Sequence, residues 1–205
     1  MTAEKIVDSV FQVLVDGSKQ DYIGEKISQL DHSLQAAAQA RESNADEETI
    51  LAALLHDIGQ FATSPGHKQM LCDAADLDPS LGSEQISVGV TGHERIGAEY
   101  LRKLGFSNKV ALLVESHVAV KRYLTGKDPQ YYQQLSSASK LSLKYQGGPY
   151  TLEEVQAFEK DPLYQLKIDL RRWDDAAKVV GLQVPGLDTY RAMAIQHLQT
   201  RNVIA

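Results

Sequence analysis

Leu54-Leu55-His56-Asp57-Ile58-Gly59 joins a His-Asp doublet to a run of apolar residues. Adjacent residues on a helix diverge by only ~100° around its axis, so both side chains of the doublet can reach one metal ion. The aspartate has two carboxylate oxygens and can also bridge two ions. Further candidate ligands lie upstream and downstream of the doublet: His32, His93, His117 and Asp174. The chain therefore carries enough imidazole and carboxylate groups for a centre of two metal ions.

The residues around the doublet have the pattern of an amphipathic helix. Their apolar positions recur at helical spacing, at Ile50, Leu51, Leu54, Leu55 and Ile58. Asn44, followed three residues later by Glu47, predicts a capping box at the start of this helix. Gly59 predicts its end. We therefore expect His56 and Asp57 in the last turn, beside the buried face.

Helical periodicity extends over most of the chain, and no convincing pair of strands is evident. We expect further helices at residues 6–15, 27–38, 94–104, 107–124, from 128, from 151, at 163–173 and after 186, with a connection at 17–24. Periodicity fades between Phe61 and Val90, where Pro65-Gly66, Pro79 and Gly82 interrupt it. This segment is expected to be an irregular insertion at 61–90 with one short helix at 70–76. The pattern predicts an all-α bundle and a single domain over residues 1–205.

Composition and charge argue against several classes of function. The 205 residues are 43% hydrophobic and 23% charged, as is ordinary for a globular protein, and the net charge of -6 argues against a nucleic-acid partner. The single cysteine, Cys72, cannot form an internal disulfide, which fits a reducing compartment. No apolar run approaches the ~18 residues of a membrane span, and the N-terminus lacks the order of a signal peptide. We expect a cytoplasmic protein with no membrane partner, and the sequence gives no oligomeric state.

Two side chains downstream of the doublet are expected to point toward the interior together. His117 shares a helical stripe with Leu113 and Val114, and Lys121 follows four residues later on the same face. A lysine directed at a core requires an anion or a carboxylate there. The pair therefore predicts a ligand nitrogen and an anion contact in one site.

Asp174 should also point inward, because it continues the row of Leu166 and Leu170 at helical spacing. A buried carboxylate costs several kcal/mol unless it binds a metal ion or a cationic partner. Arg171, one turn earlier, offers the second explanation of a simple ion pair. Both explanations stay open on the sequence alone.

Four histidines and two aspartates make a mixed set of nitrogen and oxygen ligands. The absence of cysteine ligands argues against structural zinc, and the number of imidazoles argues against a pure Mg or Ca site. Iron or manganese fits best, with zinc third. His67 and His197 lack a comparable context and are left out of the predicted site.

The spacing of His32, the His56-Asp57 doublet and Asp174 resembles the H…HD…D signature of the HD-domain superfamily. The extra histidines resemble those of its bimetallic members, and most members are metal-dependent phosphohydrolases. Longer segments are more similar to a small branch, the di-iron oxygenases that cleave organophosphonates, which are related in fold to myo-inositol oxygenase. The similar segments lie between Asp21 and about Arg191, at residues 21–25, 29–33, 55–59, 93–95, 105–107, 117–124, 145–149 and 172–174.

The resemblance implies an HD-domain helical bundle with a mixed-valent Fe(II)/Fe(III) pair and O2 as cosubstrate. One iron would be held by His32, His56, Asp57 and Asp174, and the other by Asp57, His93 and His117. Oxygenation at C1 of a 1-hydroxyphosphonate would then lead to C–P cleavage, giving phosphate and a carboxylic acid.

The resemblance also implies substrate contacts. Lys121, Ser139 and Arg171 stand where the family binds the phosphonate. Tyr22 and Glu25 match a lid pair, in which the tyrosine occupies an iron before substrate arrives and the carboxylate meets the cationic nitrogen of the substrate. Tyr22, Glu25 and Lys121 are the expected catalytic residues beside the metal ligands.

Two departures from the family concern the substrate. In the member that acts on 2-amino-1-hydroxyethylphosphonate, a histidine follows His-Asp-Ile-Gly and contacts the phosphonate. This chain has Gln60 there, which donates a hydrogen bond but carries no charge, and its insertion at 61–90 looks longer. The expected partner is a small phosphonate, 1-hydroxy-2-aminoethylphosphonate or its trimethylammonium homologue, with glycine or glycine betaine as the product.

Two other functions remain as alternatives. One is an HD-type phosphohydrolase, in which metal-bound hydroxide attacks a small phosphate ester. The other is a non-catalytic signalling module. The lid pair together with Lys121 favours the oxygenase over a simple hydrolase, which does not require these residues. A signalling module is disfavoured because such modules tend to lose ligands, whereas this chain keeps all six.

Overall fold

The computed structural model describes residues 1–17, 27–62, 68–77, 80 and 82–202. The expected lid residues Tyr22 and Glu25, most of the connection at 17–24, and His67 lie outside the described residues. The N-terminal half has the elements α1 (Ala3–Gly17), α2 (Gln29–Glu42), α3 (Glu47–Leu55), a 3-10 turn η1 (Ile58–Gln60), β1 (Gln69–Asp73), α4 (Ala74–Leu77), β2 (Gln85–Val90) and α5 (His93–Lys103). The C-terminal half has α6 (Asn108–Lys127), α7 (Pro129–Gln134), α8 (Ser137–Tyr145), α9 (Leu152–Phe158), α10 (Tyr164–Ala176) and α11 (Asp188–Asn202).

The prediction of a mainly helical protein is confirmed. Two of the expected helices begin with a side-chain cap: the Ser107 hydroxyl accepts from the backbone N–H of Val110 at the start of α6, and Thr151 and Glu154 form a capping box at α9. The helix expected from residue 128 is divided into α7 and α8. Among the described helices, none has the length and apolar character needed to cross a membrane.

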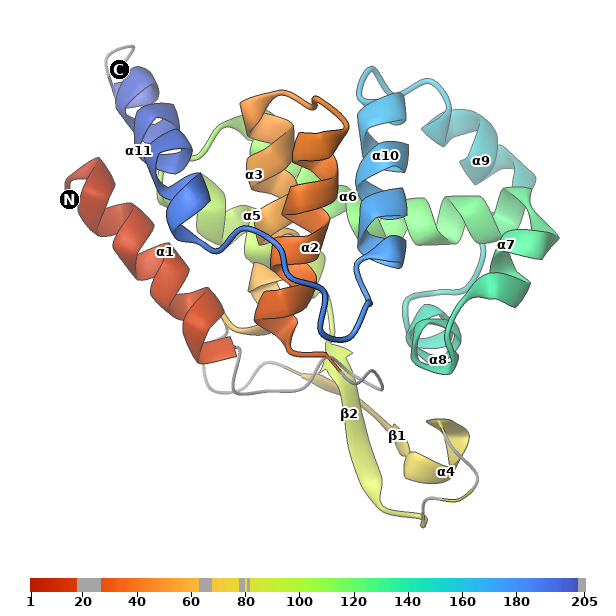
Figure 1. Cartoon of the computed structure of the whole chain (residues 1–205). Coiled ribbons are helices and arrows are strands. Elements are labelled where there is room, and N and C mark those ends of the chain that lie inside the picture. The colour runs from red at the N-terminus through yellow and green to blue at the C-terminus, as the bar shows by residue number, and fades with distance from the viewer. Residues whose placement is uncertain (18–26, 63–67, 78–79, 81, 203–205) are drawn as a thin grey trace.

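The centre of the bundle is built from α2, α3, α5, α6 and α10 (Figure 1). The long helix α6 packs on α3, α5 and α10, while α1 and α11 pack on each other at one side (Figure 1). The leucine pair Leu54-Leu55 of α3 and Leu113 of α6 have 0% of their surface exposed. Each such leucine stabilises the fold by about 1.5–3 kcal/mol relative to an exposed position. The apolar run before the doublet is therefore the interior face of the bundle.

The start of α3 differs from the prediction. Its N-cap is Asp46, whose carboxylate accepts from the Thr49 backbone N–H at 3.1 Å. Asn44 instead has a φ of 56°, and its N–H donates to the carbonyl of Arg41 at the end of α2. The capping box at Asn44 was wrong because asparagine suits the left-handed end of one helix as well as the start of the next.

The end of α3 places the doublet at a bend of the chain. The helix ends at Leu55, His56 is its C-cap residue, and Asp57 directly precedes η1. The doublet therefore follows the last turn rather than lying inside it. The chain then turns toward α5, against which η1 packs.

The insertion at 61–90 contains two antiparallel strands, so the prediction of irregular chain without strands was wrong for its described part. Burial alternates along β1, with Met70 and Cys72 inward, and Val88 of β2 joins them in a small apolar cluster. The short helix expected at 70–76 is strand β1 followed by α4. Three consecutive apolar residues in a five-residue strand are too short a signal to separate strand from helix. The hairpin and α4 protrude from the helical body in Figure 1.

Candidate metal centre

Five separate elements bring the predicted ligands into one buried cluster. His32 comes from α2, the doublet from the bend after α3, His93 from the first residue of α5, His117 from the middle of α6 and Asp174 from α10. The six residues are at most 5% exposed. Burial of so many ionisable groups is costly unless they are paired or bind metal.

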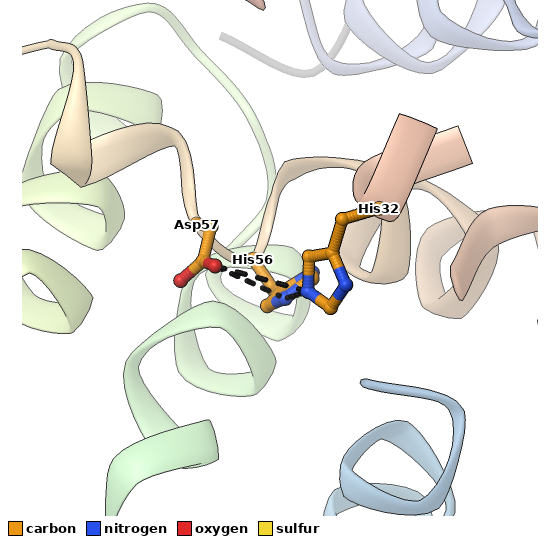
Figure 2. Close-up of side chains that lie close together, drawn as sticks. All are labelled: His32, His56 and Asp57. Atoms are coloured by element: carbon orange, nitrogen blue, oxygen red, sulfur yellow. Dashed lines mark hydrogen bonds and ion pairs between the residues drawn. The ribbon is translucent and has the colours of Figure 1, made fainter. Parts of the chain in front are cut away.

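Asp57 lies between two pairs of histidines and turns one oxygen toward each pair. Its Oδ2 is 3.8 Å from His32 Nε2 and 3.6 Å from His56 Nε2. Its Oδ1 is 3.4 Å from His93 Nε2 and 3.5 Å from His117 Nε2. Figure 2 shows the first half of this arrangement, with the His32 ring entering from α2 beside the doublet.

Asp174 completes the first half of the cluster. Its Oδ1 lies 3.3 Å from His32 Nε2 and 3.8 Å from His56 Nε2. The ligand atoms of His32, His56 and Asp57 lie within 4.8 Å of one another, as do those of Asp57, His93 and His117. Each group could hold a metal ion, and Asp57 belongs to both.

Backbone carbonyls fix the tautomer of all four rings. The Nδ1 atoms of His32, His56, His93 and His117 lie 2.7–3.0 Å from the carbonyl oxygens of Ala177, Ala53, Val90 and Val114, respectively. A carbonyl oxygen only accepts, so Nδ1 carries the proton, and Nε2 of each neutral ring presents a lone pair to the cluster. Such an outer hydrogen bond is what normally orients a metal-binding histidine.

The spacing of these lone pairs fits metal ligands. The Nε2 atoms of His32 and His56 are 3.1 Å apart, and those of His93 and His117 are 2.9 Å apart. Two nitrogens that each lie about 2.1 Å from one ion, at right angles, would be about 3.0 Å apart. A metal ion between the two nitrogens of each pair would satisfy both lone pairs, so the residues present fit two metal ions.

The electrostatics keep both carboxylates ionised. Burial alone would raise the pKa of Asp57, but the imidazoles of His56, His93 and His117 hold this pKa well below its usual range. Burial opposes ionisation of Asp174 as well, and the Arg171 guanidinium holds its pKa well below the usual range. Burial and the neighbouring His93 ring lower the pKa of His117 to about 3. At neutral pH the cluster therefore offers two carboxylates and an uncharged His117 to a cation.

The ion pair between Arg171 and Asp174, one of the two explanations that the sequence left open, is present in the structure. Its Nη1 donates to Asp174 Oδ2 at 2.7 Å, while Oδ1 of the same carboxylate faces the histidines. Arg171 also contacts Asp175 through Nη2, and its Nε donates to the Tyr131 hydroxyl at 2.9 Å. Asp174 is therefore both an ion-pair partner and a candidate ligand. Asp175 and Tyr131 were missed, although the Asp174-Asp175 doublet at i+3 and i+4 from an arginine was a usable signal.

A pocket opens beside the second half of the cluster. Lys121, Arg171, Ser139 and Gln60 line it together with Asp57 and His93, so the described residues expected to contact substrate do lie around one cavity. Lys121 is 4% exposed, and its ammonium donates to the Ser142 hydroxyl at 2.8 Å. Burial and the nearby Arg171 lower the pKa of Lys121 to about 7.

Further polar residues of this pocket were not predicted as site residues: Gln29, Ser136, Ser142 and Gln146. Ser136 caps α8 by accepting from the Ser139 N–H at 3.2 Å, so the N-terminus of α8 borders the pocket. Gln29 stands three residues before His32 on α2, and this helical spacing was the signal that would have identified it. His197, which was left out, is structural: its Nε2 accepts from the backbone N–H of Ser107 at 3.0 Å.

Comparison with known proteins shows the family to which the chain belongs. The HD domain family model matches residues 30–161. A hydroxymethylphosphonate dioxygenase of Gimesia maris is 39% identical over 90% of this chain and 84% of its own length. A 1-hydroxy-2-(trimethylamino)ethylphosphonate dioxygenase (glycine-betaine-forming) of Leisingera caerulea is 37% identical over 88% of this chain and 84% of its own. An uncharacterised protein of Acanthamoeba polyphaga mimivirus is 36% identical over 96% and 84%, respectively. The chain therefore belongs to the HD-domain family, and phosphonate dioxygenases are among its homologues.

Proposed function

We propose that this protein is an HD-domain di-iron oxygenase that cleaves the C–P bond of a small 1-hydroxyphosphonate. The observation that carries the proposal is the position of Asp57, which turns one oxygen to each histidine pair beside a pocket that contains a buried lysine. The homologues named as phosphonate dioxygenases support the same class of substrate.

The four histidines and two aspartates would hold the two irons. His32, His56 and Asp174 would hold one ion and His93 and His117 the other, with Asp57 between them. Bound there, a mixed-valent Fe(II)/Fe(III) pair would supply the site for O2 activation and for oxidation at C1. The second group offers fewer protein ligands than the first and borders the pocket, which leaves room for substrate on that side.

The pocket residues would bind and orient the phosphonate. The Lys121 ammonium and the N-terminus of α8 provide positive charge and N–H donors, as anion sites in proteins commonly do. Ser139 adds a hydroxyl, and Arg171 adds positive charge while it holds Asp174 in place. Held in this way, the C1 carbon would face the metal ligands, and water would be kept from the reacting atoms by the buried walls.

The Gln60 side chain would donate a hydrogen bond to the substrate rather than accept one. Its Oε1 accepts the backbone N–H of Val90 at 2.9 Å. Because a backbone N–H only donates, the orientation of the amide is fixed by this contact, and the Gln60 NH2 group is left for the pocket. This contact compensates in part for the absence of a charged histidine at this position.

The reaction balances without a further reductant. A 1-hydroxyphosphonate and one O2 give one carboxylic acid and one inorganic phosphate, so both oxygen atoms enter the products. Hydroxymethylphosphonate would give formate, and the 2-amino or 2-trimethylamino homologues would give glycine or glycine betaine.

Phosphate release with and without O2 tests the proposal. Iron-loaded protein should release phosphate from a 1-hydroxyphosphonate only in the presence of O2, and the substrate-bound, anaerobically reduced protein should show a half-integer-spin EPR signal. Anaerobic release of phosphate from a phosphate ester, with a redox-silent metal in the centre, would identify a phosphohydrolase instead.

A further inference from the structure

We propose that Gln29 and Gln146 select the substituent on the carbon side of the substrate, and that they favour a group that donates hydrogen bonds over a quaternary ammonium. This inference rests on the proposed phosphonate oxygenase activity. It concerns two residues of the pocket lining that are neither candidate metal ligands nor expected phosphonate contacts.

Gln29 is a buried polar side chain without a partner for its carbonyl oxygen. It is 3% exposed, lies in the first turn of α2 and lines the pocket beside the candidate ligands. Its Oε1 is buried and accepts no hydrogen bond from any described residue. A buried acceptor without a donor destabilises the fold, so a glutamine at this position indicates a ligand that supplies the donor.

Gln146 provides a second acceptor of the same kind, from a segment that is distant from α2 in the sequence. It directly follows α8 and lines the same pocket. Its Oε1 is likewise buried, with no donor among the described residues. Two glutamines from distant segments therefore line one cavity, and the amide oxygen of each lacks a donor among the described residues.

The two carboxylates in the described lining of the pocket are already engaged. Asp57 faces the two histidine pairs, and Asp174 faces His32 and Arg171. The cations Lys121 and Arg171 suit the phosphonate and would repel a positive substituent. A donor on the substrate would therefore meet the two amide oxygens.

These acceptors discriminate between classes of substituent. A primary ammonium or a hydroxyl donates hydrogen bonds to amide oxygens, whereas a trimethylammonium group donates none and is normally held by aromatic rings. The described lining of this pocket contains no phenylalanine, tyrosine or tryptophan. A site built to hydrogen-bond a substrate group discriminates strongly against the analogue that lacks it.

The experiment compares three substrates with iron-loaded protein: hydroxymethylphosphonate, 2-amino-1-hydroxyethylphosphonate and its trimethylated homologue. Phosphate release gives kcat/KM, and anaerobic calorimetry gives binding without turnover. The wild-type protein should prefer the primary amine to the trimethylated substrate in both measurements. Gln29→Met and Gln146→Met should each lower kcat/KM for the primary amine by about 10- to 100-fold, the effect of losing a hydrogen bond to a charged group. Hydroxymethylphosphonate, which has no such substituent, should be little affected.

Gln35→Met is the matched control on the same helix. Gln35 is 1% exposed, but both ends of its amide are satisfied: Nε2 donates to the Val179 carbonyl at 2.7 Å, and Oε1 accepts the Val179 N–H at 3.0 Å. This variant should lower Tm without changing the order of the substrates. Gln29→Met should leave Tm unchanged or raise it, because the Gln29 side chain makes no hydrogen bond to a described residue that would be lost.

The outcomes separate the two proposals. Preference of the wild-type protein for the trimethylated substrate, or equal losses on all three substrates in both glutamine variants, would overturn the role of Gln29 and Gln146. If the wild-type protein releases no phosphate in an O2-dependent way from any of the three substrates, the proposed oxygenase activity is overturned instead. This outcome is known from the wild-type protein alone, before any variant is compared.

Discussion

Gly59 lies so close to His93 that a Cβ atom on Gly59 would be 1.9 Å from the His93 carbonyl oxygen. The same atom would be 2.6 Å from the backbone nitrogen of Gly97. The turn that follows Asp57 therefore packs backbone to backbone on the first turns of α5. This contact sets the distance between Asp57 Oδ1 and His93 Nε2, which is 3.4 Å.

Gly59→Ala should separate the two halves of the metal centre. The added methyl group cannot fit without moving η1 from α5, and overpacking of this kind typically lowers the free energy of unfolding by about 1–3 kcal/mol. We expect a lower Tm and loss of metal mainly from the group that contains His93, measured by denaturation and metal analysis. Gly82→Ala is the control, because a Cβ atom there meets no atom within 4 Å. Full metal content in Gly59→Ala would show that the close approach does not position the site.

Asp57→Ala should remove metal from both groups, since Asp57 is the residue that the two groups share. Asp174→Ala should deplete mainly the first group, and His93→Ala or His117→Ala mainly the second. Metal content per chain and phosphate release measure these effects. Retention of two irons per chain in Asp57→Ala would contradict the bridging position of the carboxylate.

The sequence predicted the helical framework because each helix carries its own signal. The stripe at Leu51, Leu54 and Leu55 and the helical periodicity at 107–124 are local features, and the structure places α3 and α6 there. The strand pair β1–β2 had no comparable signal. Its strands are short, and their pairing depends on contacts between Gln69–Asp73 and Gln85–Val90, which no local pattern encodes.

The residues of the candidate site also divide into those that the sequence identifies and those that only the structure shows. The candidate ligands could be identified from the sequence because histidines and carboxylates on an apolar helix face are rare. The polar neighbours could not be identified in this way. Gln29, Ser142 and Gln146 belong to types that are usually exposed, and only the tertiary structure shows that they border one cavity. Likewise, the carbonyls that orient the histidine rings are backbone groups, which carry no sequence identity.

Lys121→Met should separate substrate binding from metal binding. Met keeps the length of the side chain and removes the ammonium, so iron content should be unchanged. Apparent affinity for a phosphonate should fall by the worth of one charge-assisted contact, about 1.5–3 kcal/mol, or roughly 10- to 100-fold. An unchanged KM would show that Lys121 serves only its contact with Ser142 and the nearby carboxylates, with the anion bound elsewhere.

The pH dependence of binding should also depend on Lys121. Burial and the nearby Arg171 lower the pKa of Lys121 to about 7, although Asp174, Asp175 and Asp57 act to raise it. Below this pKa the lysine is an ammonium that attracts the phosphonate, and above it the charge is lost. Substrate affinity should therefore decrease as pH rises through about 7, by at most tenfold per pH unit. The ratio of wild-type to Lys121→Met affinity removes the titration of the phosphonate itself, and a ratio that does not vary with pH would contradict the assignment.

Gln60→Glu should test the donor role of Gln60 with little change in stability. The carboxylate keeps an oxygen for the Val90 N–H, which Gln60 Oε1 now accepts at 2.9 Å, but it replaces the NH2 donor with a negative charge. Loss of the donor and repulsion of the phosphonate should raise KM by roughly 10- to 100-fold for every phosphonate tested. Gln60→His restores a group that donates and can carry charge, so it should retain affinity. Gln60→Met loses both the donor and the Val90 contact, and it should lower Tm more than Gln60→Glu. An unchanged KM in Gln60→Glu would mean that the NH2 group does not face the phosphonate, because a negative charge beside that anion would weaken its binding.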